Sequence, residues 1–416
     1  MVTSRERIKC ALEHKESDRI PIDFGGMRST GISTIAYNKL KMKLDINKKP
    51  SRMYDFIQQL AYPEKEILDL FKVDAIDASR GFLKSDKYWR EWILNDGSKC
   101  LIPKYLDIEI GKDSTVFLKN KEGIILGKKP KNSLYVDHAF WVYGNCQRIP
   151  RKLGKNDLTK QMWEIPTPEW SFNIFDKSEY ELFANNIKKL YENTDYAILL
   201  GVGCSFLERG NYLRGMENFL CDIYQDKKGV GILFDKFLEG YLETLNRLLK
   251  EVGQYVDVVV FGDDLGFHNG SIFSLEKFKE LFKPRYKKLY DFVHENSNCK
   301  VFLHSCGSIY NFLPDLVDIG LDILNPVQTN SYNMNPKKLK KEFGKDITFW
   351  GGGCDTANIL PNATPKEVKE DVKKRIDIFA NGGGFVFSQI HNILADVPPE
   401  NIIAMFEAAN EYSSNI

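Results

Sequence analysis

The chain has 416 residues, of which 43% are hydrophobic and 28% are charged, so its composition is that of a globular protein and excludes a disordered one. Lysine and arginine number 58 against 57 aspartates and glutamates, and a net charge of +1 argues against a nucleic-acid-binding or membrane-surface protein. No apolar stretch reaches the roughly 18 residues of a membrane span, and the first residues, charged from Arg5 onward, do not resemble a signal peptide. We therefore expect a cytoplasmic protein that binds neither nucleic acid nor membrane.

Short apolar runs alternate with amphipathic helices through most of the chain, which is typical of parallel β/α units. In chain order, the expected strands are residues 20–24, 73–76, 196–200, 255–261, 300–303, 321–324, 347–350 and 384–387. Helices are expected over residues 274–295, 312–319, 336–343, 364–380 and 398–412. Eight parallel strands in this order predict an α/β protein folded as a closed (β/α)8 (TIM) barrel. We expect residues 1–416 to form a single domain of this kind.

Residues 80–168 interrupt this alternation. They contain Trp89, Trp92 and Trp141 and short alternating runs such as residues 114–118, separated by polar segments. This pattern predicts a β-rich insertion after the second barrel strand. Long insertions in the βα loops of barrels usually carry specificity, so we expect a lid that covers part of the barrel mouth and adds aromatic side chains to the substrate pocket.

Polar and metal-binding side chains collect at the C-terminal ends of the expected strands, where barrel enzymes carry their chemistry. In chain order they are Asp23, Asp77, Glu208, Asp263, Asp264, His304, Cys306, Asn325, Cys354, Asp355, Gln389 and His391. Because the parallel strands of a barrel end at one rim, we expect these side chains to surround a single mouth.

A metal site is the sharpest hypothesis that these residues support. His304 and Cys306 supply an imidazole and a thiolate from one turn, and Cys354 follows a strand two positions away. Three nitrogen and sulfur ligands with an open position are typical of catalytic zinc, whereas Mg²⁺ and Ca²⁺ prefer oxygen. The alternative is that both cysteines are small core residues and His304 is a hydrogen-bonded core histidine. Their position at the rim favours the metal site.

The other rim residues are candidates for catalysis and substrate binding. His391 has three candidate roles: a fourth ligand, the third ligand in place of Cys354, or an acid/base group that contacts the substrate. A carboxylate of the 263–264 pair can equally cap the following segment, and Glu208 can instead pair with its neighbour Arg209. The catalytic candidates are His391, Asp264 and Glu208, and the substrate-binding candidates are Asp23, Asp263 and Asn325.

Several motifs resemble a known family. They lie at residues 5–7, 11–14, 18–21, 262–266, 304–308, 352–356, 391–393 and 396–401. With them, most of the chain resembles the uroporphyrinogen decarboxylase superfamily, a family of (β/α)8 barrels that includes zinc- and corrinoid-dependent methyltransferases. Residues 80–168 lie outside the shared core.

The resemblance is to the methyltransferase branch of that superfamily. The decarboxylases use no metal and hold an acidic tetrapyrrole with arginines near the first strand, whereas residues 23–28 contain one arginine and an extra carboxylate. The methyltransferases carry a His-x-Cys motif and a later cysteine as zinc ligands. In the thiol-methylating members this cysteine follows strand eight, near the position of His391, whereas Cys354 follows strand seven. The resemblance implies His304, Cys306 and Cys354 as ligands, with His391 nearby.

The Gly-Gly-Cys-Asp-Thr segment and the long insertion resemble the corrinoid-dependent O-demethylases of anaerobic bacteria. The resemblance implies that zinc coordinates the ether oxygen of a small methyl donor, a methoxylated aromatic compound. The Co(I) corrinoid (cobalamin) of a separate partner protein, docked at the barrel mouth, then takes the methyl group. The alternatives are a thiol-methylating enzyme that uses a methyl-corrinoid protein, a metal-free lyase like uroporphyrinogen decarboxylase, and a non-catalytic barrel that binds a small ligand.

Overall fold

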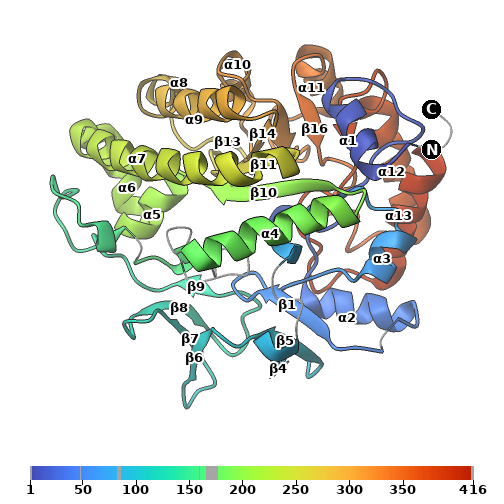
Figure 1. Ribbon diagram of the computed structural model, residues 1–416, viewed down its shortest axis with the longest axis horizontal. Helices are drawn as coiled ribbons and strands as arrows, with labels where there is room; N and C mark the ends of the chain where they lie inside the picture. Colours follow the sequence, from blue (N-terminus) through green and yellow to red (C-terminus); the bar gives the residue numbers. More distant parts are fainter. Residues whose placement is uncertain (1, 47, 82–85, 159, 165–176, 414–416) are drawn as a thin grey trace.

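The computed structural model describes residues 2–46, 48–81, 86–158, 160–164 and 177–413. Its central element is a curled sheet of seven parallel strands in the order β17-β16-β15-β14-β11-β10-β3 (Figure 1). These strands are β3 (Ala75–Asp77), β10 (Ala197–Gly203), β11 (Val258–Gly262), β14 (Lys300–His304), β15 (Ile323–Asn325), β16 (Thr348–Trp350) and β17 (Phe385–Val386).

The chain segment at residues 22–23 closes this sheet. Ile22 forms a parallel bridge with Phe387 at one edge, and Asp23 forms one with Ala75 at the other. Two residues thus take the place of the strand expected at 20–24, since Pro21 has no N–H and the N–H of Ile22 donates to Asp74 Oδ2 instead of a strand carbonyl (2.8 Å). The prediction of a (β/α)8 barrel is confirmed.

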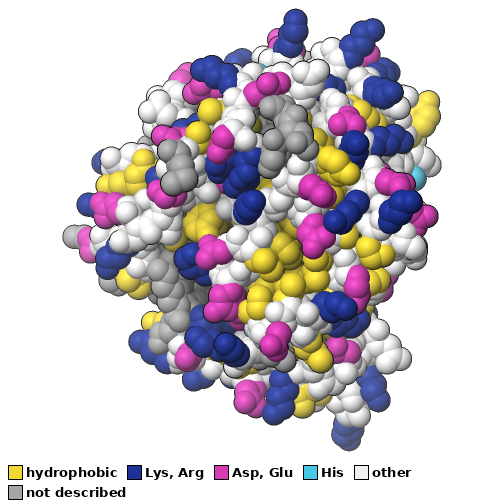
Figure 2. Space-filling view, turned by 90° about the vertical axis from the view of Figure 1, so that its right-hand side faces the viewer, with side chains coloured by type: hydrophobic (Ala, Val, Ile, Leu, Met, Phe, Trp, Pro, Cys, Tyr) yellow, Lys and Arg dark blue, Asp and Glu magenta, His cyan; other side chains and the backbone are white. Residues whose placement is uncertain are grey.

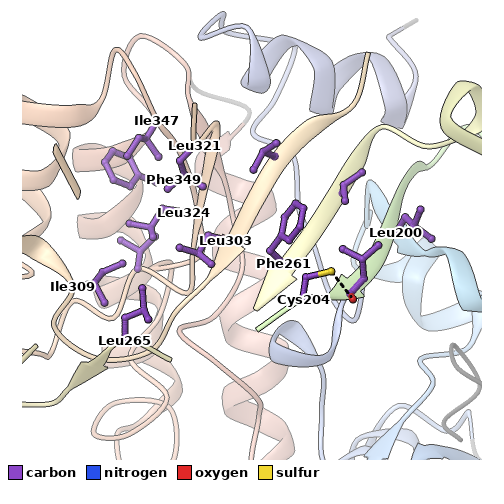
Figure 3. Close-up of a cluster of buried hydrophobic side chains, with 14 of the residues drawn as sticks. Leu200, Cys204, Phe261, Leu265, Leu303, Ile309, Leu321, Leu324, Ile347 and Phe349 are labelled. Carbon is purple, nitrogen blue, oxygen red and sulfur yellow. Dashed lines mark hydrogen bonds between the residues drawn. The ribbon is translucent and has the colours of Figure 1, made fainter. Parts of the chain in front are cut away.

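Alternate residues of the strands fill the barrel interior, and the residues between them face the helices. The interior cluster includes Leu199, Val260, Phe302, Ile323, Trp350 and Val386, all buried. The outward set includes Leu200, Phe261, Leu303, Leu324 and Phe349, which pack in the layer between sheet and helices (Figure 3). Because side chains alternate, residues two positions beyond the interior cluster point into the C-terminal mouth of the barrel.

Helices surround the barrel, and all five regions expected to be helical contain them. The α-helices are α1 (Ser4–Leu12), α2 (Thr34–Lys43), α3 (Lys65–Leu70), α4 (Lys177–Asn193), α5 (Leu207–Arg214), α6 (Met216–Gln225), α7 (Lys227–Val252), α8 (Leu275–Lys277), α9 (Lys283–Asn296), α10 (Leu313–Asp318), α11 (Pro336–Phe343), α12 (Pro365–Phe379) and α13 (Pro399–Ser413). A π-helical turn, Phe278–Phe282, joins α8 to α9. Thr364 and Glu367 form the capping box that begins α12.

The surface carries both signs of charge. Figure 2 shows Lys and Arg side chains interspersed with Asp and Glu over one face, in keeping with the net charge of +1. Within the described residues, no helix combines the length and the apolar character that crossing a membrane requires.

The insertion between β3 and β10 is rich in strands, as predicted. Its strands are β4 (Trp89–Ile93), β5 (Lys99–Pro103), β6 (Asp107–Ile110), β7 (Val116–Lys119), β8 (Ile125–Lys129) and β9 (Asp137–His138). β4 and β5 join the earlier strands β1 (Ser51–Asp55) and β2 (Leu60–Ala61), and β6 to β9 form a second sheet. Both sheets lie together at the bottom of Figure 1.

The insertion is attached to the C-terminal end of the barrel. Tyr143 N donates to Leu213 O (2.8 Å), and Arg214 Nη1 donates to Cys146 O (2.7 Å). Both contacts are made to α5, the helix that directly follows β10. The β-rich segment therefore lies on the side of the barrel where the strands end.

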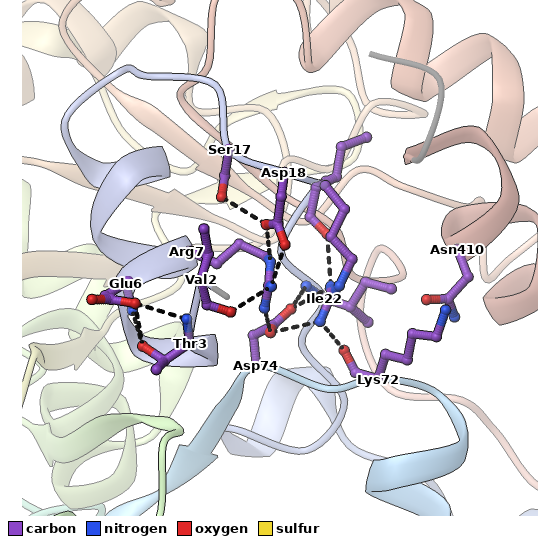
Figure 4. Close-up of polar contacts among 12 residues, drawn as sticks. Val2, Thr3, Glu6, Arg7, Ser17, Asp18, Ile22, Lys72, Asp74 and Asn410 are labelled. Carbon is purple, nitrogen blue, oxygen red and sulfur yellow. Dashed lines mark hydrogen bonds and ion pairs between the residues drawn. The ribbon is translucent and has the colours of Figure 1, made fainter.

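A buried ion-pair network lies near the strand N-termini (Figure 4). The fully buried Asp74 accepts hydrogen bonds from Arg7 Nη1 (2.7 Å) and from Arg19 Nη1 and Nη2 (2.7 and 2.8 Å). Arg7 also donates to Asp18 through Nε (2.7 Å) and Nη2 (2.8 Å). The network joins α1 to the closing segment of the barrel through the N–H of Ile22.

Candidate metal centre

His304 is the last residue of β14 and points into the barrel mouth, two residues beyond Phe302. Its Nδ1 lies 2.6 Å from Asn325 Oδ1. The Nδ2 of Asn325 donates to Trp350 O (2.8 Å), so Oδ1 must face the histidine, and Ser29 Oγ donates to the same oxygen (2.8 Å). Nδ1 of His304 is therefore the protonated nitrogen, and Nε2 presents a lone pair to the mouth.

The lone pair faces two other potential ligands. Cys306 Sγ lies 3.4 Å from His304 Nε2. The ligand atoms of His304, Cys306 and His391 all lie within 4.8 Å of one another. The backbone of His391 has a φ of 119°, in a region that residues other than glycine rarely adopt. Backbone strain of this kind persists where the surroundings enforce it, often at functional sites.

This donor set fits zinc. Two imidazoles and a thiolate are ligands that Zn²⁺ accepts, and three protein ligands leave a fourth position for a substrate. Burial, with His304 adding to it, lowers the pKa of His391 to about 4, so its imidazole is neutral at pH 7, as a metal ligand must be. Burial, followed by the carboxylates of Asp264 and Glu208, raises the pKa of the Cys306 thiol well above its ordinary value. A metal ion would have to displace that proton.

Cys354, the third ligand expected from the sequence, is not part of this group. Its thiol is fully buried in the core between sheet and helices, and burial raises the thiol pKa. Only its backbone reaches toward the site: Cys354 O accepts from Ile390 N (3.0 Å), next to His391. Gly351 and Gly352, with φ of 122° and 72°, turn the chain between β16 and Cys354. The group of potential ligands in the described residues therefore consists of His304, Cys306 and His391.

Two catalytic candidates adjoin the cluster. Asp264 Oδ1 accepts from Cys306 N (2.8 Å) and lies 3.6 Å from His304 Nε2. Glu208, in the first turn of α5, lies close enough for Asp264 to raise its pKa, after the larger effect of burial. Tyr212 Oη, one helical turn further, donates to Glu208 Oε1 (3.4 Å). Glu208 is thus a buried carboxyl group with a raised pKa beside the potential metal ligands.

Asp263, expected to bind substrate, instead holds α5 in place. It is fully buried, and its carboxylate accepts hydrogen bonds from the backbone N–H of Phe206 (2.7 Å), Leu207 (2.9 Å) and Glu208 (2.9 Å). Tyr286 Oη donates to it as well (2.5 Å). These four bonds occupy the carboxylate, so its contacts are those of a residue that positions Glu208. Asn325, also expected to bind substrate, orients His304 in the same way.

Asp23, the third substrate-binding candidate, is fully buried within the barrel. It accepts from Trp350 Nε1 (2.7 Å) and from Gly26 N (2.7 Å). Burial is the largest influence on this carboxyl and raises its pKa to about 6. Its contacts stabilise the turn after the closing segment rather than reaching an open space.

We expect Asp23 to make the metal-free protein less stable as pH rises from about 4 to about 6. In that window the folded state keeps the proton that the unfolded chain, with a carboxyl pKa of 3.8, has already released. The loss is about 3 kcal/mol for a shift of this size. Urea unfolding of the wild type and of Asp23→Ala across this pH range measures it. Equal pH slopes for the two proteins would contradict the assignment.

Asn325→Leu is expected to weaken zinc binding by about 10- to 100-fold, the usual effect of removing a hydrogen bond to a ligating histidine. Leucine has a similar volume but no oxygen to hold Nδ1 of His304. Competition with a chromophoric chelator measures the affinity, and Asn358→Leu, at an exposed position, is the matched control. Unchanged affinity in a folded Asn325→Leu protein would show that the histidine needs no such orientation.

Two aromatic residues near the mouth, Trp163 and Tyr212, were not predicted from the sequence. The rings of Trp163, from the insertion, and Tyr212 lie 6.3 Å apart, and the guanidinium of Arg28 lies 5.2 Å from the Trp163 ring. His138 Nε2 contacts Tyr212 O (2.9 Å). Tyr212 was detectable in principle, because it lies four residues after Glu208 on one helical face. Trp163 was not, since nothing in its neighbourhood indicates where the insertion folds back.

Comparisons with known proteins fit this architecture. The sequence model of the uroporphyrinogen decarboxylase (URO-D) family matches residues 199–412. The chain is 25% identical to uroporphyrinogen decarboxylase of Actinobacillus succinogenes over 198 residues, which are 46% of this chain and 51% of that protein. For the enzyme of Vibrio campbellii the identity is 26% over 197 residues, with the same coverage. The chain thus spans about half the length of the curated relatives it matches.

A solved structure, a methyltransferase from Methanosarcina mazei, is similar over 99% of both chains. The TM-score is 0.58 at 16% sequence identity. The two proteins therefore share a fold along their whole length, including the region before residue 199.

Proposed function

This chain belongs to the uroporphyrinogen decarboxylase family, and we propose that within it the protein is a zinc-dependent methyltransferase. It would move a methyl group from a small methoxylated aromatic donor to the Co(I) corrinoid of a partner protein. The observation that carries the proposal is the convergence of His304, Cys306 and His391 at the barrel mouth. The name of the Methanosarcina mazei protein, a methyltransferase of the same fold, supports it.

The residues have separate tasks in this proposal. His304 Nε2, Cys306 Sγ and the imidazole of His391 would hold zinc, which as a Lewis acid supplies stabilisation of the oxygen that loses its methyl group. Asn325 fixes the tautomer of His304, and Asp264 fixes the backbone of Cys306. Glu208, whose pKa burial raises, would serve as the acid that donates a proton to the leaving oxygen.

The partner needs access to the mouth. Phe267, on the hairpin after β11, is 43% exposed, and Tyr332, in the loop after β15, is 62% exposed. A hydrogen bond from Tyr332 N to His268 O (2.8 Å) holds the two loops together. In the proposal, this apolar rim receives the corrinoid protein, and Trp163 of the insertion shields the substrate from water.

A metal-free decarboxylase is the less favoured alternative. A tetrapyrrole carries several carboxylates and needs free cationic side chains. Arg28, the arginine after the first strand, is ion-paired with the fully buried Asp55 (2.9 Å). This pairing supports a small, uncharged substrate over an acidic macrocycle.

The test is anaerobic incubation of the zinc-loaded protein with a Co(I) corrinoid protein and a panel of methoxylated aromatics. We expect methyl-Co(III) absorbance to appear together with the free phenol. Thiols supplied with methyl-Co(III) test the thiol-methylating alternative, and uroporphyrinogen tests the lyase. If no donor produces methyl-Co(III) and uroporphyrinogen is decarboxylated without zinc, the proposal is wrong.

A further inference from the structure

Two glycines beside the metal-binding cluster face open space. A Cβ atom added at Gly201 would meet no other atom within 4 Å, and one at Gly262 would meet only His304 Cβ, at 4.0 Å. Gly203 and Gly270 also meet no atom within 4 Å, but three other glycines near this end of the barrel are tightly surrounded. A Cβ at Gly266, Gly307 or Gly353 would lie within 3.0 Å of a neighbouring atom. Open space thus lies at the ends of two neighbouring strands, β10 and β11.

Strand register places this space next to His304. Gly262 pairs directly with His304, and Gly201 pairs with Val260, one layer below. Because Leu199 and Val260 belong to the interior cluster, Gly201 and Gly262, two residues further along their strands, face the mouth as well. The missing side chains therefore leave bare backbone at Gly262, beside His304, and at Gly201, one layer below it.

We propose that Gly201 and Gly262 are specificity-determining residues that form the floor of a subsite for a flat, uncharged ring carrying the methyl group. This inference rests on the proposed function. Bare peptide groups on adjacent strands, about 4.8 Å apart, make a flat surface on which a planar ring can lie. The His304, Cys306 and His391 cluster at its edge is the independent indication that a ligand binds here.

Neighbouring groups argue that the ring is uncharged. Asp264 follows β11 directly, and Glu208 begins the helix after β10, so two carboxyl groups flank the bare strand ends. The side chain of Asp264 is 40% exposed and its Oδ1 lies 3.6 Å from His304 Nε2, so its negative charge faces the space in which the ring would lie. A carboxylate on the ring would be repelled there. Tyr212, hydrogen-bonded to Glu208, brings an aromatic ring to the same side.

The experiment uses Gly201→Ala and Gly262→Ala in the zinc-loaded full chain. Neither glycine has a positive φ, and the added methyl groups meet no close neighbour, so both variants should fold with unchanged zinc content and equal or higher Tm. Gly240→Ala is the matched control, because Gly240, in α7, also faces open space but lies far along the chain from the site. The probes are methoxybenzene, 4-methoxybenzoate and methanol.

Binding is measured directly by saturation-transfer NMR titration, without the corrinoid partner. We expect methoxybenzene to bind the wild type and Gly240→Ala equally, and each site variant about tenfold more weakly, the usual effect of one misplaced methyl group in a pocket. 4-Methoxybenzoate should bind the wild type more weakly than methoxybenzene. Methanol, too small to reach the glycines, should behave alike in all four proteins.

Site variants that bind methoxybenzene like the wild type, or a wild type that binds none of the aromatic probes, would overturn the subsite. A stronger interaction with 4-methoxybenzoate would overturn its uncharged character. These outcomes are separate from the proposed function. If the wild type transfers methyl groups and the glycine variants are unaffected, the proposed function stands and the subsite is wrong. If the wild type binds the ring but transfers no methyl group, the subsite stands and the proposed function is wrong.

Discussion

Cys306→Ala is expected to lower zinc affinity by more than about 100-fold and to abolish methyl transfer. Changes to residues that only support the ligands usually lower the affinity by about 10- to 100-fold. The thiolate is the only anionic ligand in the proposed set and carries most of the charge attraction for Zn²⁺. Since the thiol is protonated in the metal-free protein and His391 is already neutral, zinc binding should release the proton of Cys306. Wild-type affinity should therefore rise about tenfold per pH unit between about pH 7.5 and 8.5. Chelator competition measures both quantities.

Cys354→Ala is the matched control, because it changes the same residue type two strands away. Its thiol lies in the core and outside the ligand group, so this variant should keep its zinc and its pH slope. His391→Ala should lose most of its zinc. The opposite pattern, with zinc lost from Cys354→Ala and kept in His391→Ala, would restore the ligand set expected from the sequence.

Asp74→Ala is expected to lower the free energy of unfolding by roughly 3–5 kcal/mol, the effect of breaking a buried ion pair from one side. Asp74 is fully buried and pairs with two arginines, Arg7 and Arg19, whose side chains are 7% and 14% exposed. Removing the carboxylate leaves both guanidinium groups without their shared partner and frees the N–H of Ile22. Urea unfolding, followed by circular dichroism, measures the loss.

Asp18→Ala serves as the comparison, since Asp18 pairs with the same Arg7 from a side chain that is 46% exposed. Arg7 holds the pKa of Asp18 down, to about 2. Exposure screens this pair, so we expect a loss of no more than about 1 kcal/mol at neutral pH. Similar losses for the two variants would show that the network does not depend on burial.

The sequence placed His304 and Cys306 together at the barrel mouth because they lie on a strand and its immediate continuation. His304 ends β14, and the alternation that buries Phe302 also directs His304 into the mouth. For Cys354 the same reasoning failed, because Gly351 and Gly352 break the alternation before the cysteine is reached. Nearness to a strand end predicts where a residue lies, and after such a turn it no longer predicts where the side chain points.

Roles were harder to predict than positions. Asp263, Asp264 and Asn325 all lie at strand ends as expected, yet only Asp264 leaves a carboxylate partly exposed beside the cluster, with its side chain 40% exposed. Asp263 instead accepts hydrogen bonds from backbone N–H groups, and Asn325 is hydrogen-bonded to His304. Hydrogen-bond partners often come from segments far apart in the chain, as Ser29 and Asn325 do. No local sequence pattern predicts such pairs.

The bridges at Ile22 and Asp23, which close the barrel, would also couple metal binding to the stability of this closure. Ser29, a few residues beyond these bridges, supports the amide that orients His304, and His391 follows the strand on the other side of the closure. The last segment of the chain thus supplies one potential ligand, His391, and the first segment supports the residue that orients another, His304. A metal ion that binds only the closed barrel would stabilise this closure. It would add RT ln(1 + [Zn²⁺]/Kd) to the free energy of opening the barrel. Amide hydrogen exchange at the two ends of the chain would slow together.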